Sequence, residues 1–593
     1  MLKFNSWNKK YKTPFGAVSC GEVITFTFPI DKNVSPDEVF IIVRKQERSV
    51  KYQLPFLREE DGFAVYRTSF SLQEAGIYYY RFEVNCGGLT HFVGKGIGGY
   101  AVNADWLPEF QLTVYEAGFE GAKWLNGGLI YHIFPDRFAR VKDNQTPLFG
   151  YLKHWHEDVT VVDDDGVFRA NDFFGGNIKG VISKIDYLVS LGVSAIYFSP
   201  IFESSSNHRY DTADYMKIDS LFGTEEEFSK LIEKCKSAGI EIILDGVFNH
   251  TGADSIYFNK FNHYNSVGAY QSLESKYNSW YTFTDFPDTY KCWWDITVVP
   301  TIARESEGYQ ALIAGKNGVI DKWTKMGVKG WRLDVVDELS ANFVEKIRDQ
   351  AKSHGDVAVI GEVWEDASTK VAYSEQRNYL FGKQLDGVMN YPYRTAIINY
   401  VKGGAPHDFK IDIMTIAENY PMCVLNNCMT LLGTHDTIRT INELSDVVQP
   451  EDRSERLWRN LSSAEYYTAK RRLHLASILQ YILPGVPTVY YGDEVGMQGW
   501  QDPVNRRTYP AIIDTDILEH YKKLGAFRKA YSADLTSDIE IHCSGGVLKI
   551  TRGRLTITAN NSWEPLSLGS EVYDEFSHSW VTEVAGMSAI ITK

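Results

Sequence analysis

The sequence lacks a long apolar run, a cluster of basic residues and any pair of cysteines at metal-ligand spacing. No apolar run could span a bilayer and residues 1–7 contain no signal-peptide core, so we expect a cytoplasmic protein without a membrane segment. The formal charge is −15, from 61 Lys and Arg against 76 Asp and Glu. That balance disfavours nucleic acid and anionic membranes as partners.

The seven cysteines are an odd number and are scattered along the chain, which favours a reducing compartment over a disulfide framework. Internal repeats and low-complexity tracts are also missing. Because 593 residues exceed what one hydrophobic core accommodates, we expect three or four folding units.

Aromatic residues, in contrast, are abundant, at 14% of the chain with 14 Trp and 36 Tyr. Such a surplus can simply fill a core. In an acidic protein it also suits neutral hydroxylated ligands such as sugars, whose C–H faces stack on aromatic rings.

Residues 1–122 contain short runs rich in β-branched and aromatic residues, separated by Gly, Asp, Asn and Pro. The clearest runs are residues 23–28, 39–43, 63–66 and 76–82. This pattern predicts an N-terminal β-sandwich of immunoglobulin-like size. The sandwich could bind a polymer, form a homodimer contact or cover the next domain.

From about residue 124 the pattern changes to a repeated alternation of strand and helix. Near-continuous apolar runs, typical of strands buried on both faces, lie at residues 129–134, 193–198, 240–244, 328–333, 357–360, 387–389, 429–432 and 486–491. Helical periodicity appears between them, for example at residues 178–191 and 225–238. Eight such units predict an α/β fold, a TIM (β/α)8 barrel over residues 123–532.

Two segments interrupt or follow this alternation. Residues 251–307, between the third and fourth predicted strands, are rich in Asn, Tyr, Ser, Phe and Trp, and we interpret them as an insertion domain over the barrel mouth. Residues 533–593 return to short alternating strands, such as 548–551 and 555–558, and predict a C-terminal β-sandwich.

Polar side chains follow several predicted barrel strands where each strand ends. The third strand is followed by Asp245, Asn249 and His250, the fourth by Arg332 and Asp334, the fifth by Glu362 and Trp364, and the seventh by His435 and Asp436. In a TIM barrel these side chains meet in one bowl at the carboxyl ends of the strands.

Hydrolysis of a glycosidic bond needs two carboxyl groups, one ionised and one protonated. Arg332 favours the ionised form of Asp334, and partial desolvation favours the protonated form of Glu362. Taken singly, these groups have other interpretations. Asp245, Asn249 and His250 could form a structural hydrogen-bond cluster or ligate a metal. His435 and Asp436 could be a satisfied pair in the core.

The strand-end motifs are Asp-Gly-Val-Phe-Asn-His at 245–250, Gly-Trp-Arg-Leu-Asp at 330–334, Gly-Glu-Val-Trp at 361–364 and Leu-Gly-Thr-His-Asp at 432–436. With these motifs the chain resembles the α-amylase family, glycoside hydrolase family 13. The segments at 131–138, 207–215 and 385–392 resemble its neopullulanase, cyclomaltodextrinase and maltogenic amylase branch.

The resemblance implies that Asp334 is the nucleophile, Glu362 the acid/base and Asp436 the carboxylate that stabilises the transition state. It also implies a set of residues that bind substrate or support the site. These are Arg332, His250, His435, Tyr210, His208, Asp502, Arg506, Trp364, Glu338 and Asp245. Arg332 would orient Asp334, Tyr210 would stack on the sugar before the cleaved bond, and Glu338 would lie near the acceptor subsites.

The chain departs from the branch in places. Val-Val-Pro-Thr-Ile at 298–302 replaces Met-Pro-Lys-Leu-Asn, Glu365 stands where His is common, and Asp337 stands where Asn is common. In the usual calcium loop, Arg-Val-Lys follows at 140–142 and Asn177 replaces Asp. We therefore expect no metal there and no required cofactor, although a structural calcium through Asn249 stays open.

We predict a retaining α-glucan hydrolase acting on α-1,4 bonds in maltooligosaccharides or cyclodextrins, and action on α-1,6 bonds is left open. A transglycosylase of the same family is the alternative. A non-catalytic amylase-like carbohydrate-binding protein is a rival of another class, disfavoured because Asp334, Glu362 and Asp436 are all present. A metal-dependent hydrolase is less favoured still, since no metal spacing appears at the strand ends.

Overall fold

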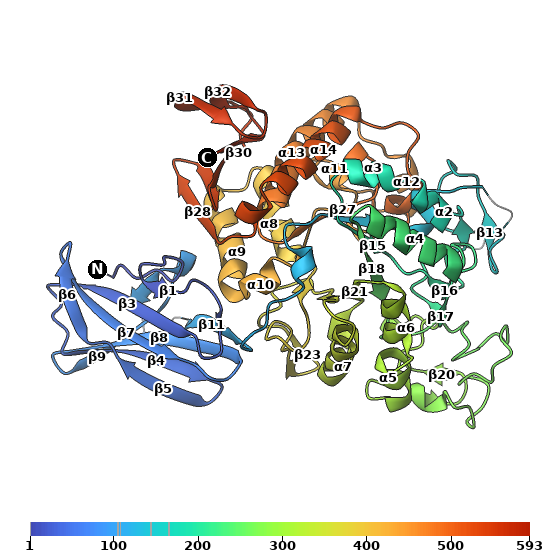
Figure 1. Cartoon of the computed structure of the whole chain (residues 1–593), viewed down its shortest axis with the longest axis horizontal. Coiled ribbons are helices and arrows are strands. Elements are labelled where there is room, and N and C mark those ends of the chain that lie inside the picture. The colour runs from blue at the N-terminus through green and yellow to red at the C-terminus, as the bar shows by residue number, and fades with distance from the viewer. Residues whose placement is uncertain (1, 104–105, 107, 143–144, 164–165) are drawn as a thin grey trace.

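The structure, a computed structural model, describes residues 2–103, 106, 108–142, 145–163 and 166–593. Its N-terminal part contains two antiparallel-rich sheets, drawn in blue in Figure 1. One sheet has the order β1 (Lys12–Thr13), β3 (Val23–Asp31), β7 (Phe63–Ser71), β6 (Phe56–Glu60). The other joins β10 (Ala101–Asn103), β9 (Leu89–Lys95), β8 (Gly76–Cys86), β11 (Phe110–Tyr115) and β2 (Val18–Ser19), with β4 (Glu38–Lys45) paired to β8 and β5 (Arg48–Gln53) paired to β4.

The alternating residues of these strands explain the packing of the two sheets. Phe28 of β3 stacks on Phe82 of β8 with ring centroids 4.1 Å apart, and both side chains are fully buried. Phe110 of β11 stacks on Tyr80 at 4.9 Å. Inward-facing aromatic residues from both sheets therefore form one core, as a sandwich requires.

Eight parallel strands form the central sheet. Their order is β25 (Gly387–Val388), β22 (Ala358–Gly361), β21 (Gly330–Leu333), β18 (Glu241–Gly246), β15 (Ala195–Phe198), β12 (Ile130–Ile133), β27 (Val486–Tyr490) and β26 (Met429–Leu431). A parallel bridge between Met389 and Met429 joins the two ends of this order. The predicted (β/α)8 barrel is confirmed, and all eight strands fall within the predicted runs or within two residues of them.

Helices pack around the barrel after most strands. They are α1 (Pro135–Phe138), α2 (Ile178–Ile182), α3 (Ile185–Ser190), α4 (Glu225–Ser237), α5 (Glu307–Ala314), α6 (Val319–Met326), α7 (Ala341–Lys352), α8 (Tyr391–Val401), α9 (Pro406–Asn419), α10 (Met422–Leu425), α11 (Thr440–Glu443), α12 (Arg453–Trp458), α13 (Ser463–Ile482), α14 (Thr515–Ala530) and α15 (Ser532–Leu535). The connection from β22 to β25, described throughout, contains no helix. It contains the hairpin of β23 (Val371–Ala372) and β24 (Glu375–Gln376) instead.

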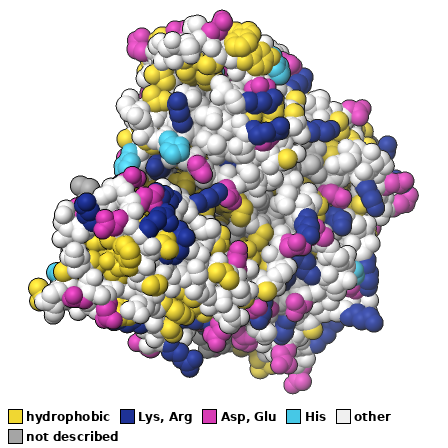
Figure 2. All heavy atoms as spheres, turned by 60° about the vertical axis from the view of Figure 1, so that its left-hand side comes forward, with side chains coloured by type: hydrophobic (Ala, Val, Ile, Leu, Met, Phe, Trp, Pro, Cys, Tyr) yellow, Lys and Arg dark blue, Asp and Glu magenta, His cyan; other side chains and the backbone are white. Residues whose placement is uncertain are grey.

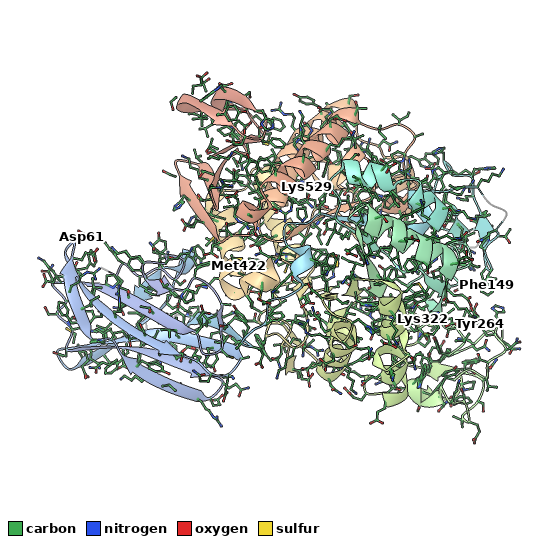
Figure 3. All side chains as sticks on the ribbon, viewed as in Figure 1. Asp61, Phe149, Tyr264, Lys322, Met422 and Lys529 are labelled. Atoms are coloured by element: carbon green, nitrogen blue, oxygen red, sulfur yellow. The ribbon has the colours of Figure 1, made fainter. Side chains whose placement is uncertain are left out.

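The segment between β18 and α5 is the predicted insertion. It contains η3 (Asn278–Trp280), β19 (Phe283–Asp285), β20 (Thr289–Tyr290) and η4 (Trp293–Asp295). A bridge of His250 with Thr301 ties it to the segment after β18, and a bridge of Tyr281 with Ile302 joins two parts of the insertion itself. Phe149, from the loop after β12, stacks on His263 of the insertion at 4.9 Å, and Figure 3 labels Phe149 close to Tyr264 at this edge.

The C-terminal part is again built of strands. A four-stranded sheet has the order β28 (Ile539–Ser544), β29 (Val547–Arg552), β30 (Leu555–Asn560), β33 (Ser588–Thr592), and β31 (Leu566–Asp574) pairs with β32 (Ser579–Val584). Buried Arg552 donates to the carbonyl of Ile482 at the end of α13 at 2.7 Å. Strand-rich regions at both ends of the chain thus complete the predicted fold class, while the domain boundaries stay predictions.

Two further features concern the charges on the surface and the length of the helices. On the face shown in Figure 2, Lys and Arg lie among Asp and Glu side chains instead of forming one basic area. No helix in the described ranges is both long and apolar enough to cross a membrane.

Candidate active site

The buried guanidinium of Arg332 is the centre of the site. The parallel register places Asp245 of β18 beside Arg332 of β21, and Gly361, just before Glu362, beside Leu333. Arg332 Nη1 lies 2.8 Å from Asp245 Oδ1 and 2.7 Å from Asp334 Oδ1, and Nη2 lies 2.8 Å from Glu362 Oε2. One cation thus joins the ends of three strands.

The three carboxyl groups around Arg332 also affect one another. Burial raises the pKa of Asp334 well above its ordinary value, and Glu362 and Asp245 raise it further, whereas Arg332 lowers it. Burial likewise raises the pKa of Asp245. Asp334 is thus subject to opposing influences, because Arg332 lowers its pKa while burial and two neighbouring acids raise it, and the expectation that Arg332 keeps Asp334 ionised stays a prediction.

Glu362 is held by two donors besides Arg332. The backbone N–H of Val335 lies 2.8 Å from Glu362 Oε2, and Trp364 Nε1 lies 3.0 Å from Oε1. Val335 has φ of 36°, a left-handed conformation that is rare for a β-branched residue and marks local strain next to Asp334. Trp364 is 47% exposed and stacks on Tyr391 at 3.7 Å.

Asp436 and His435 follow β26 on the other side of the site. His435 Nε2 lies 3.1 Å from Asp436 Oδ2, and Arg506 Nη2 lies 3.4 Å from Asp436 Oδ1. Asp502 pairs with Arg506 at 2.8 Å. Burial and the nearby Glu362 raise the pKa of Asp436 to about 7, while burial keeps the pKa of His435 well below its usual value, so this imidazole is neutral.

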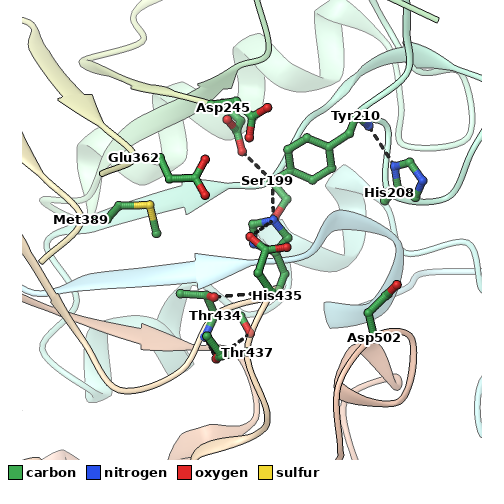
Figure 4. A network of polar contacts seen from close by, with 12 residues as sticks. Ser199, His208, Tyr210, Asp245, Glu362, Met389, Thr434, His435, Thr437 and Asp502 are labelled. Carbon is green, nitrogen blue, oxygen red and sulfur yellow. Dashed lines mark hydrogen bonds and ion pairs between the residues drawn. The ribbon is translucent and has the colours of Figure 1, made fainter. Parts of the chain in front are cut away.

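Tyr210, from the loop between β16 (Phe202–Ser204) and β17 (Thr212–Ile218), connects the two sides. Its hydroxyl lies 2.9 Å from Asp245 Oδ2 and 2.6 Å from His435 Nε2, and its ring stacks on His435 at 5.1 Å. Figure 4 shows Tyr210, Asp245, Glu362 and His435 turned toward a shared space, with Asp502 at its edge.

The two remaining histidines lie beside Tyr210. His250 Nε2 is 3.1 Å from the carbonyl oxygen of Tyr210, and burial lowers the pKa of His250 to about 4. The backbone N–H of Tyr210 donates to His208 Nδ1 at 3.1 Å. The structure therefore brings the predicted residues together at one end of the barrel, with one exception.

Glu338 is that exception, because no hydrogen bond or ion pair among the described residues joins its carboxylate to the Arg332 group. It ends the short helix η5 (Val336–Glu338) and accepts a hydrogen bond from the hydroxyl of Tyr373 in the β23–β24 hairpin. It follows Asp334 by four residues, in a segment that begins with Val335, whose backbone N–H donates to Glu362.

Sequence reasoning missed three aromatic residues of the site. Tyr197 donates to Asp245 Oδ2 at 2.6 Å, Trp293 stacks on His250 at 5.3 Å, and Tyr391 supports Trp364. Tyr197 could have been found, since it is the second-last residue of β15 and strand ends carry the site. Trp293 lies in a segment without periodicity, so no local pattern indicated its contact.

At the altered calcium loop, amide and backbone groups bond to one another. Asn177 accepts from the backbone N–H groups of Gly180 at 2.9 Å and Val141 at 3.2 Å, and donates to the Val141 carbonyl at 2.8 Å. Arg140 donates to the carbonyl of Phe174 at 2.9 Å. In the described part of the chain, no three His, Cys, Asp or Glu residues group as a metal site.

A (β/α)8 barrel with acids, an arginine and neutral histidines at the carboxyl ends of its strands is the architecture of a barrel enzyme that works with carboxyl groups. The family model described as "Alpha amylase, catalytic domain" matches residues 132–537. The chain belongs to the α-amylase family.

Individual relatives agree with the family. The amylopullulanase of Thermoanaerobacter thermohydrosulfuricus is 33% identical over 93% of this chain, and a cyclomaltodextrinase of Thermoanaerobacter pseudethanolicus is 32% identical over 79% of this chain and 75% of its own length. The chain spans less than half the length of the amylopullulanases it matches, 40% in the first case. The type III pullulan hydrolase from Thermococcus kodakarensis matches all of both chains, with a TM-score of 0.68 and 25% identity.

The raised pKa of Asp436 predicts a pH-dependent stability. Its carboxyl ionises near its ordinary pKa of 3.8 in the unfolded chain but at about 7 in the folded one, so its ionisation destabilises the fold increasingly as pH rises from 4 to 7. Asp436→Asn should therefore raise the free energy of unfolding at pH 8 by about 1 kcal/mol, a modest gain because water screens a side chain that is 34% exposed.

Denaturant unfolding of both proteins at pH 4 and pH 8 measures this difference. Asp349→Asn, at an exposed position of α7, serves as the control and should leave both values unchanged. An equal gain at pH 4 and pH 8, or none at pH 8, would contradict the role given to the ionisation of Asp436.

Proposed function

We propose that this chain is a retaining α-glucan hydrolase that cleaves α-1,4 bonds in maltooligosaccharides, cyclodextrins or related glucans, and the products from pullulan decide whether it also cleaves α-1,6 bonds. The bonding of both Asp334 and Glu362 to the one guanidinium of Arg332 carries the proposal. This arrangement favours the short carboxyl separation of retaining glycosidases, about 5 Å. Relatives named cyclomaltodextrinase, neopullulanase and maltogenic α-amylase support it.

The proposed reaction has two displacements. Asp334 attacks the anomeric carbon while Glu362 gives its proton to the glycosidic oxygen, so the bond to the leaving sugar breaks and a glucosyl ester forms. Glu362 then takes a proton from water as the water oxygen attacks the same carbon and releases Asp334.

The remaining residues would hold the sugar before the cleaved bond. Asp436, bonded to His435 and Arg506, would accept hydrogen bonds from sugar hydroxyls and stabilise the positive charge of the transition state. Tyr210 offers a ring face, and neutral His208 and His250 offer donors and acceptors at fixed positions. Asp502 and Arg506 would close the far side.

Transfer to a second sugar is the alternative within the same chemistry, because the ester can be opened by a sugar hydroxyl as well as by water. A purely carbohydrate-binding role is less well supported, since binding alone does not require three acids arranged around one arginine and one sugar position. No organic cofactor enters either reaction, and we propose that no metal occupies the loop that contains Asn177.

Glu362→Gln tests the acid/base role. The amide keeps the size of the side chain but has no proton to give, so kcat on maltotriose should fall by about three orders of magnitude or more while substrate binding persists. Kinetics and isothermal titration measure the two quantities. Glu226→Gln on the exposed face of α4 is the control, and unchanged kcat in Glu362→Gln would remove Glu362 from this role.

Proton NMR of the first products tests the covalent route. Two displacements at one carbon restore its configuration, so the newly formed reducing end should be the α anomer before mutarotation. The β anomer as first product would exclude Asp334 as the nucleophile.

A side-by-side product assay on maltotriose, β-cyclodextrin, pullulan and starch tests the substrate class. We expect release of glucose or maltose from the first two faster than from starch, and cleavage of pullulan where both linkages are accepted. No turnover on any of the four would contradict the proposed function.

The compartment and the assembly are also proposals. Free thiols at all seven cysteines, each in the described ranges, support a reducing compartment such as the cytoplasm. Exposed Val50, Phe56 and Leu57 on β5 and β6 support a homodimer through the N-terminal part. Sedimentation should show a dimer that Phe56→Glu weakens while leaving turnover of maltotriose within about twofold; a monomer at every concentration would contradict it.

A further inference from the structure

The connection from Glu365 to Tyr379, here called the strap, lies where an ideal barrel has its fifth helix. It contains the β23–β24 hairpin, which Figure 1 shows beside α7. The N-terminal part contacts the strap, since Gln111 Nε2 donates to Ser368 Oγ at 2.9 Å. The strap is therefore a fixed part of the structure with contacts on two sides.

Four side chains of the strap bond to the two acids that follow Asp334 most closely, Asp337 and Glu338. These side chains are Lys370, Tyr373, Arg377 and Tyr379. Lys370 Nζ lies 3.0 Å from Asp337 Oδ2, Tyr379 Oη lies 2.7 Å from Asp337 Oδ1, and Arg377 Nη2 lies 2.6 Å from the Asp337 carbonyl. Tyr373 donates its hydroxyl to Glu338.

The strap lies on the side of the site where the leaving sugar departs. Glu362, the group that would protonate that sugar, is followed at once by Trp364 and Glu365. Glu365 Oε2 is 2.5 Å from Lys370, which also holds Asp337. An acceptor sugar would take the place that the leaving sugar vacates, beside Glu362 and Trp364, and the contacts of Lys370 with Glu365 and Asp337 bring the segment that contains Glu338 to this same side.

The position of Tyr373 is set by its contacts and not by local preference. Tyr373 and Ser374 have φ of 54° and 63° at the hairpin turn, a left-handed conformation that favours Gly and Asn. The ring is 61% exposed and lies 4.5 Å from the guanidinium of Arg304, so the Glu338 hydrogen bond and this cation–π contact hold the strained turn.

We propose that Tyr373 is a positioning residue which, by donating to Glu338, withholds that carboxylate from an acceptor sugar, so that water takes the glucosyl group. A carboxylate bound by a phenol has less capacity to accept from sugar hydroxyls. Water can attack the ester without a hydrogen bond to Glu338. The inference rests on the proposed function and deepens it, since it concerns the choice between hydrolysis and transfer.

The test is the ratio of transfer to hydrolysis products from maltotriose with added glucose. Tyr373→Phe keeps the ring and removes the hydroxyl, so the ratio should rise about three- to tenfold. Turnover without glucose should stay within about twofold. Tyr467→Phe, an exposed tyrosine on α13, is the matched control.

A double variant separates positioning from a merely structural effect. In a Glu338→Gln background, Tyr373→Phe should no longer change the ratio, because the two residues act through one contact. An unchanged ratio in the single variant, or an equal rise in both backgrounds, would overturn the inference while leaving the hydrolase intact. No product from the unaltered chain would overturn the proposed function and this inference together.

Discussion

The site depends on a single buried cation. Arg332 extends from β21 to acids that follow or belong to three adjacent strands, and the parallel register fixes which positions face one another. A buried guanidinium without carboxylates would be strongly destabilising, and buried carboxylates without it would be neutralised. The same contact thus binds the mouth of the barrel together and arranges the two groups, Asp334 and Glu362, that the proposed chemistry needs.

The two sides of this centre are built differently. On the side of Asp436, an aromatic ring and a neutral imidazole stack, Tyr210 on His435, beside the ion pairs of Arg506, and such a stack suits a neutral sugar held in one orientation. On the side of Glu362, the strap brings Lys370 and Tyr373 onto acids. This difference agrees with the proposed reaction, in which the Asp436 side would hold the sugar that forms the ester and the Glu362 side would release the leaving sugar.

The barrel and the convergence of the site could be predicted because acids and histidines come directly after the apolar runs of several predicted strands. The sequence could not predict contacts made across the chain, such as that of Trp293 with His250. The same limit hid the sharing of Arg332, since the sequence shows this residue two positions from Asp334 but not that Asp245 and Glu362 contact the same guanidinium. For the same reason the sequence did not predict that the strap replaces the fifth helix, because the strap is defined by the contacts of its hairpin with other segments.

The charge imbalance of the site is itself a reason for catalysis. Asp245, Asp334, Glu362, Asp436 and Asp502 face two guanidinium groups, Arg332 and Arg506, so acids outnumber cations, and burial and mutual repulsion raise the pKa of Asp334 and Asp436. A neutral sugar relieves none of that repulsion. An oxocarbenium-like sugar ring bound as proposed would relieve it, because its positive charge would face Asp334 and Asp436. The arrangement that destabilises the ionised acids would then stabilise the proposed transition state more than the substrate.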